Sequence, residues 1–116
     1  MKIAIAKIRL KSSEEGGKSL AIGQGGDFGC PVFFKDVAAL SEHAYDCRLL
    51  LKRIGITIFP GQTVENVPIA FLSPEEVFQH LQVGVSFKLW ESREIGEGEI
   101  TEIYLPDENP RSENKS

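Results

Sequence analysis

The feature that most constrains the fold is a series of short apolar segments whose side chains alternate and which glycine and proline interrupt. Residues 2–10, KIAIAKIRL, are the clearest case, because β-branched residues recur there with a period of two, which is typical of a strand. One face of this segment carries apolar side chains alone: Ala4, Ala6, Ile8 and Leu10. We therefore expect this face to point into a core.

Further strand candidates follow along the chain. They are residues 30–37 (CPVFFKDV), 45–54 (YDCRLLLKRI), 63–72 (TVENVPIAFL), 83–92 (VGVSFKLWES) and 93–105 (REIGEGEITEIYL). Pro31 is compatible with an edge strand or with the start of a strand. Residues 45–54 fit a strand or a helix, and the Pro60-Gly61 turn that follows favours a strand. Gly96 and Gly98 indicate a bulge or tight corner in the last segment.

One segment predicts a helix, residues 73–84 (SPEEVFQHLQVG). Ser73 stands at the N-cap, Pro74 at the first helical position and Glu76 at the capping-box position, while Gly84 supplies a stop.

In the predicted strand 83–92, the side chains expected to face inward are those of Val83, Val85, Phe87 and Leu89. This number of strands with one short helix predicts an all-β fold, a small closed barrel over residues 1–105. The polar, proline-containing residues 106–116 read as a disordered tail.

Composition narrows the function classes. The formal net charge of −4 argues against a general role in binding duplex DNA, which draws on clustered lysine and arginine. No apolar stretch is long enough to span a bilayer, and Lys7 and Arg9 interrupt the N-terminal run, so we expect no signal peptide and a soluble, cytoplasmic protein. Cys30 and Cys47 have neither a disulfide-framework nor a metal spacing, and free thiols are the ordinary interpretation, although a pairing stays open.

The glycine-rich residues 14–29 contain Gly17-Lys18-Ser19, which matches the end of a phosphate-binding loop. The first glycine of that motif would fall on Ser12, and further glycines follow where a helix should begin. The dinucleotide pattern needs a glycine where Phe28 stands. We therefore expect no nucleotide site and no cofactor.

Catalysis has little support in the sequence. His43, Asp46 and Cys47 lie close together along the chain, but no pattern for an oxyanion hole accompanies them. His80 lacks an acidic or cysteine partner at metal spacing. We expect neither an enzyme nor a metal site.

A resemblance covers residues 3–104. The opening of the C-terminal barrel, domain 3, of elongation factor Tu resembles the segment KIRLKSSEEGG. The turn and strand that follow in that domain resemble IGITIFPGQTVENVPIAFL. Its closing hairpin resembles VGVSFKLWESREIGEGEI. The joint order of the three carries the likeness. It implies a six-stranded antiparallel closed barrel without the GTPase domain, with residues 73–84 as a short inserted helix.

In the full factor this barrel packs against the GTPase domain and helps hold the T-arm of aminoacyl-tRNA. Lys18 and Ser19 follow the Glu-Glu-Gly-Gly segment where that family contacts tRNA, and Arg93 matches an arginine in the closing hairpin. The residues after Ser19 depart from the family, and Ser92 replaces a family glycine. These departures weigh against tRNA binding and leave the fold intact.

Two functions follow as expectations. One is a non-catalytic, stand-alone barrel that binds a protein partner, a translation component or a toxin directed against translation. The other is an RNA-binding module with a reduced tRNA-arm contact. Trp90 is expected on the outer side of its strand as an interface anchor, or else packed under the helix. The candidate binding residues are Gly17, Lys18, Ser19, Trp90 and Arg93.

Overall fold

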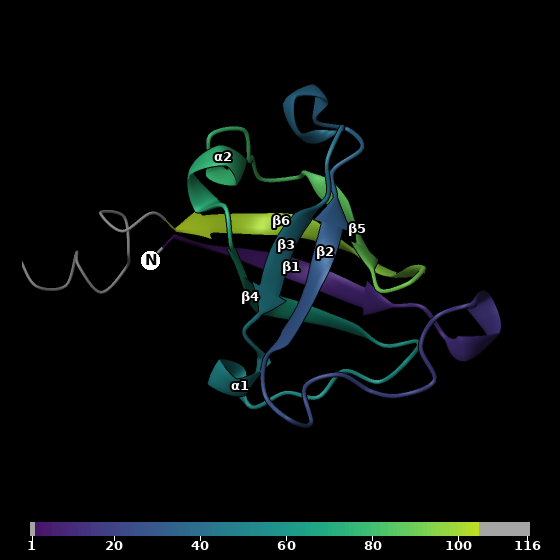
Figure 1. The fold of residues 1–116 in the computed structure, drawn as a ribbon. Helices are drawn as coiled ribbons and strands as arrows, with labels where there is room; N and C mark the ends of the chain where they lie inside the picture. Colours follow the sequence, from purple (N-terminus) through teal and green to yellow (C-terminus); the bar gives the residue numbers. More distant parts are fainter. Residues whose placement is uncertain (1, 105–116) are drawn as a thin grey trace, which may run out of the picture.

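The chain folds into one closed antiparallel barrel. The computed structural model describes residues 2–104, so the tail predicted over residues 106–116 lies outside the described range. Within that range six strands are neighbours in the order β1-β4-β3-β2-β5-β6 (Figure 1). They are β1 (Ile3–Leu10), β2 (Phe28–Phe33), β3 (Tyr45–Leu49), β4 (Thr63–Phe71), β5 (Ser86–Trp90) and β6 (Glu94–Tyr104). The predicted all-β, six-stranded closed barrel is confirmed.

The short helices lie between the strands and at the ends of the barrel (Figure 1). They are α1 (Leu51–Ile54), α2 (Pro74–Phe78) and two 3-10 turns, η1 (Ser13–Glu15) and η2 (Ala38–Leu40). The segment 45–54 contains both of its predicted alternatives, because strand β3 ends at Leu49 and α1 begins two residues later. Asp27 accepts a hydrogen bond from the Lys52 amide at 3.0 Å, which satisfies a free donor in the first turn of α1.

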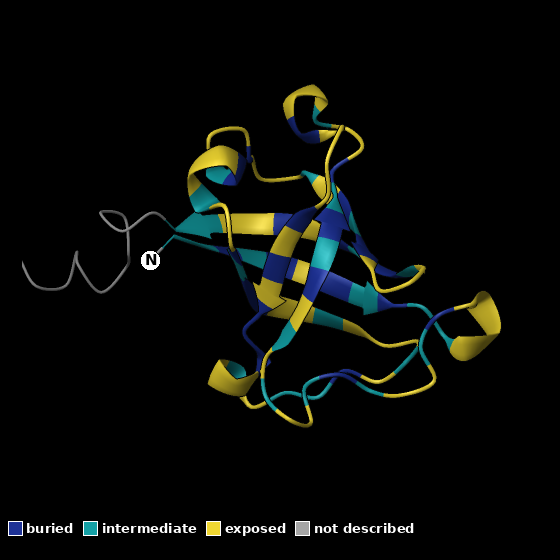
Figure 2. Ribbon diagram, viewed as in Figure 1, coloured by how far each residue is buried: buried dark blue, intermediate teal, exposed yellow. Residues whose placement is uncertain are grey.

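The barrel interior is filled by the alternating apolar faces of the strands, drawn dark blue in Figure 2. The predicted inward face of β1 is confirmed, since all four of its residues are buried. Phe34 lies at the centre of the aromatic packing, with ring centroids 5.9 Å from Phe71 and 5.8 Å from Phe87. Burial on the order of 25 cal/mol per Å² of apolar surface makes this core the main source of stability.

Neither placement predicted for Pro31, an edge strand or a strand start, is found. Closure of the barrel places β2 between β3 and β5, and Pro31 is the fourth of its six residues. Pro31 is accommodated by the register. It pairs with Asp46 of β3, whereas pairing with β5 begins one residue later, at Val32. A proline has no amide hydrogen to donate, so it fits beside a position where the ladder on one side has not yet begun.

Gly96 and Gly98 were expected to mark a bulge or corner. The β5–β6 register does shift beside Gly96, since Leu89 pairs with Gly96 and Trp90 with Glu94. Close packing also explains why glycine is required at both positions. A Cβ atom on Gly96 would lie 2.5 Å from the Arg9 carbonyl oxygen, and one on Gly98 would lie 2.3 Å from the Phe87 ring.

The helix predicted over residues 73–84 is shorter than expected. Helix α2 ends at Phe78, and the side chain of Ser73 makes no capping hydrogen bond within the described chain, so the predicted capping box is wrong. Glu76 instead accepts a hydrogen bond from the Tyr45 hydroxyl at 3.0 Å. Tertiary contact with β3 therefore takes the carboxylate that the local motif would have used.

Of the four side chains predicted to face inward in residues 83–92, Phe87 and Leu89 are buried, which confirms the prediction for them. Val85 is only half-buried. The prediction is wrong for Val83, which is 64% exposed. Gly84 explains the difference, because its φ of +96° interrupts the extended backbone before β5 begins at Ser86. The Gly84 amide donates to the Ile100 carbonyl at 2.7 Å rather than ending a helix.

Candidate interaction surface

The structure brings two of the predicted binding segments together, although they are far apart in the sequence. An open hollow of about 240 Å³ lies between the chain after η1 and the β5–β6 turn. Its lining consists of Lys18, Ser19, Leu20, Glu91, Ser92, Arg93 and Ile95. We call residues 17–20 and 90–93 together the loop–hairpin surface. Lys18, Ser19 and Arg93, three of the five residues that the sequence selects for binding, line the hollow, and Gly17 and Trp90 flank it along the chain.

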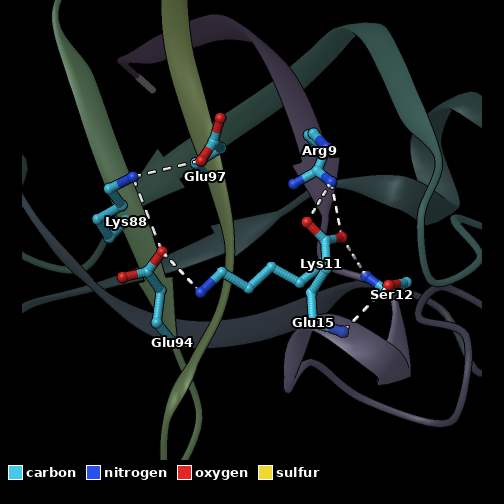
Figure 3. A network of polar contacts seen from close by, with 7 residues as sticks. All are labelled: Arg9, Lys11, Ser12, Glu15, Lys88, Glu94 and Glu97. Atoms are coloured by element: carbon cyan, nitrogen blue, oxygen red, sulfur yellow. Dashed lines mark hydrogen bonds and ion pairs between the residues drawn. The ribbon is translucent and has the colours of Figure 1, made fainter.

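A capping box at η1 shapes the start of this surface. The Glu15 amide donates to the Ser12 hydroxyl, and the Ser12 amide donates to the Glu15 carboxylate at 2.9 Å (Figure 3). Arg9 of β1 also donates to both oxygens of that carboxylate, at 2.7 and 2.8 Å. The hydrogen bonds from Arg9, with those from Ser12, lower the pKa of Glu15 to about 2, and Glu15 in turn raises the pKa of Arg9. The turn is thus tied to the barrel wall.

Gly17 positions the loop rather than offering a contact of its own. It is buried, its amide donates to the Ser12 carbonyl at 2.9 Å, and a Cβ atom there would lie 2.5 Å from the Lys11 carbonyl oxygen. Since Cβ atoms do not approach backbone oxygen so closely, position 17 requires glycine. Its role in the surface is to bring Lys18 and Ser19 to the hairpin.

Lys18 is not a free cation. Its ammonium forms an ion pair with Glu91 of the hairpin and lies 5.7 Å from the centroid of the Phe28 ring. The side chain is 23% exposed. A carboxylate at contact distance offsets the charge that a phosphate would need, so Lys18 links loop to hairpin.

Trp90 lies on the outer side of β5, as expected, and is 39% exposed. Its ring meets Phe33 of β2 edge to face, with centroids 5.5 Å apart. The alternative, packing under the helix, is wrong, because α2 places Phe78 against Phe71 instead. The Phe33 contact holds the indole while leaving part of it open to solvent.

The hairpin tip carries backbone strain and an exposed cation. Ser92 has a φ of +65°, a left-handed conformation that favours glycine, and the Glu91 amide donates to the Arg93 carbonyl at 2.8 Å across the turn. Arg93 is exposed and forms no ion pair with any residue from 2 to 104. It is the one predicted phosphate contact whose charge is available.

The neighbouring barrel wall has mixed charge. Lys11 and Lys88 both reach Glu94, at 3.2 and 3.7 Å, and Lys88 also reaches Glu97 at 3.3 Å (Figure 3). These side chains are partly exposed, so each pair contributes little to stability, typically about 0–1 kcal/mol. Their effect is to offset charge, because Lys11 and Lys88 each have an acidic neighbour.

The imagined catalytic grouping does not assemble. Asp46 and Cys47 alternate on β3, so Asp46 points to solvent and Cys47 into the barrel, while His43 is exposed and packs on Tyr45. No group of three or more histidine, cysteine, aspartate or glutamate side chains among residues 2–104 could hold a metal ion. No helix in the same range is long and apolar enough to cross a membrane.

The sequence did not select three members of the surface, Leu20, Glu91 and Ser92. Leu20 is 72% exposed, and an apolar residue inside a polar glycine-rich loop was the available signal. Glu91 had none, because its pairing with Lys18 depends on how barrel closure juxtaposes the loop and the hairpin.

Comparison with known proteins adds no relative. No protein-family model matches the chain, and a search of curated proteins finds no match. The resemblance to domain 3 of elongation factor Tu therefore stays a prediction that rests on the residues quoted for it.

Proposed function

We propose that this chain is a non-catalytic β-barrel module that binds a protein partner through the loop–hairpin surface. One observation carries the proposal: Leu20 and Trp90 are exposed in two segments that the Lys18–Glu91 ion pair joins, and Glu91 offsets the lysine charge there. A partly exposed tryptophan held by a neighbouring ring is a frequent anchor of protein interfaces. Two exposed apolar side chains and an ion pair suit contact with a protein surface better than contact with a phosphate backbone.

The distribution of charged side chains favours a protein over a nucleic acid as the binding partner. Affinity for phosphates comes mainly from free lysine and arginine, since these release counterions. On this side of the barrel Arg9, Lys11, Lys18 and Lys88 each face a carboxylate. Arg93 alone among the predicted phosphate contacts lies without such a neighbour in the described chain.

The proposed partner class comes from the resemblance. If the barrel is of the elongation factor Tu type, its partner is a component of the translation machinery or a toxin that acts on it, and its working place is the cytoplasm. Small barrels serve many functions. The experiment must therefore identify the partner by its dependence on this surface.

The decisive test is affinity capture from a translation-active cell extract treated with nuclease, using the full chain as bait. Trp90→Ala should lose the captured protein, and Leu72→Ala should retain it. Leu72 is a matched control, because it is 59% exposed but follows β4 next to α2, outside the loop–hairpin surface. Identical captured proteins for both variants, or none with the unaltered chain, would contradict the proposal.

The alternative is an RNA-binding module with a reduced tRNA-arm contact. Arg93 favours it, because it forms no ion pair within residues 2–104. In that case tRNA should bind at low salt, with an affinity that falls as salt rises. Arg93→Glu should abolish the binding, whereas Arg53→Glu, on exposed α1, should leave most of it. Absence of tRNA binding at low salt would eliminate this alternative.

A further inference from the structure

We infer that Cys30 and Cys47 form a cross-strand dithiol, a modification site that a low-molecular-weight disulfide converts into an intramolecular disulfide. The two residues are direct partners in the β2–β3 register. Both are buried and present as free thiols in the described structure. Alternation along β2 and β3 turns both side chains to the barrel interior. This inference is independent of the proposed function.

The register brings the two sulfurs within bonding reach after a small adjustment. Directly opposed residues of an antiparallel pair have Cβ atoms about 4.5–5.5 Å apart. A disulfide needs about 3.5–4.5 Å between these atoms. The pairing extends from Phe28 with Leu49 to Val32 with Tyr45, so two residue pairs on each side hold the cysteines in line. Drawing the strands together stores strain, which makes such a disulfide easily reduced.

The two thiols differ in a way that assigns their roles. A hydrogen bond from the Cys47 thiol lowers the pKa of Cys30, and the backbone amide of Trp90 adds to this effect. The same hydrogen bond and burial raise the pKa of Cys47. Cys30 is also the more accessible, at 6% against 1% exposure. Because the thiolate is the reactive form, Cys30 attacks first and Cys47 resolves.

Access to Cys30 runs through the seam between β2 and β5. These strands pair at two positions, Val32 with Leu89 and Phe33 with Lys88, just beyond Cys30 in the sequence. Short pairings open locally more readily than long ones. Opening this seam exposes Cys30 while the longer β2–β3 pairing keeps Cys47 opposite it.

The reaction balances with a disulfide as oxidant. The Cys30 thiolate attacks one sulfur of the small disulfide, forms a mixed disulfide and releases one thiolate. Cys47 then gives its proton to solvent and attacks the Cys30 sulfur, which releases the second thiolate. The protein loses two protons and two electrons, and the oxidant becomes two small thiols.

The test exposes the folded, reduced chain to oxidised glutathione and follows thiol content, non-reducing peptide maps and size. Both thiols should disappear, a Cys30–Cys47 linked peptide should form in a monomer, and dithiothreitol should restore both thiols. Trp90 provides an optical readout, since it is the single tryptophan and its amide lies against Cys30. Its emission should change with the same time course.

Single variants test the order of attack. Cys47→Ala should accumulate a stable mixed disulfide at Cys30. Cys30→Ala should react at least about tenfold more slowly, because burial still raises the pKa of the remaining thiol and limits its access to the oxidant. If a variant does not fold, the peptide map and thiol content of the unaltered chain still test the inference. Glutathione on both cysteines, covalent dimers, or thiols that react in denaturant but not in the folded chain would overturn the inference.

Discussion

Lys18 forms an ion pair with Glu91, a residue 73 positions further along the chain. This contact joins the loop after η1 to the β5–β6 hairpin and offsets the lysine charge at the centre of the loop–hairpin surface. Both side chains are partly exposed, at 23% and 44%. The pair therefore matters more for which ligand this surface attracts than for how strongly the barrel holds together.

Glu91→Gln should raise the affinity of the protein for polyanions, because it leaves the Lys18 charge without its partner beside Arg93. Elution from a heparin column should move to higher salt. Glu65→Gln is the matched control, since it changes the net charge equally at an exposed position of β4, and it should have a smaller effect. A double-mutant cycle on Lys18 and Glu91 should give a coupling of about 0.2–1 kcal/mol. Equal shifts for both variants would refute this role.

Acid should weaken the barrel through Glu15. Hydrogen bonds from Arg9 and Ser12 lower its pKa from 4.5 to about 2, so its ionised form is favoured in the folded state. The stabilisation is therefore fully present above the unfolded value and is lost as pH falls through the folded value. Melting temperatures measured from pH 7 to pH 2 should drop between about 4.5 and 2. Glu15→Gln should flatten this drop, whereas Glu14→Gln, at the exposed neighbouring position, should not.

Gly98→Ala should destabilise the protein, because the new methyl group would lie 2.3 Å from the Phe87 ring inside a packed core. Overpacking of this kind costs about 1–3 kcal/mol in the free energy of unfolding, measurable by urea denaturation. Gly29→Ala serves as the control. Its nearest contact would be 3.6 Å away, in the ordinary van der Waals range, so stability should change by less than about 1 kcal/mol. Equal costs at both sites would contradict the packing explanation.

Ser92→Gly should stabilise the hairpin tip by up to about 1 kcal/mol, since a side chain in the left-handed region costs roughly 1–2 kcal/mol, in part offset by the greater freedom of glycine in the unfolded chain. Ser86→Gly provides the contrast. Position 86 lies in the extended β5, where glycine should destabilise by about 0.5–1 kcal/mol. A loss of stability at position 92 would show that the turn is not strained.

Local sequence patterns predicted the strands correctly where neighbouring residues and tertiary packing favour the same conformation. The inward face of β1 follows from alternation alone, and the turn at Pro60-Gly61 precedes β4 as expected. Prediction was wrong where a distant partner intervened. Glu76 bonds to Tyr45 instead of capping α2, and Val83 precedes a left-handed Gly84 that ends the expected alternation. The capping box at Ser12 and Glu15 is local and was overlooked beside the phosphate-loop motif.

The sequence by itself determined that this chain forms a small barrel, because period-two alternation and glycine-proline turns act between near neighbours. It also singled out Gly17, Lys18 and Arg93 as candidates. Tertiary structure alone decided their state. Lys18 is neutralised by Glu91, and Cys30 stands opposite Cys47, because strand register and barrel closure set which distant residues meet. That information resides in no single segment, since it depends on the packing of all six strands around one core.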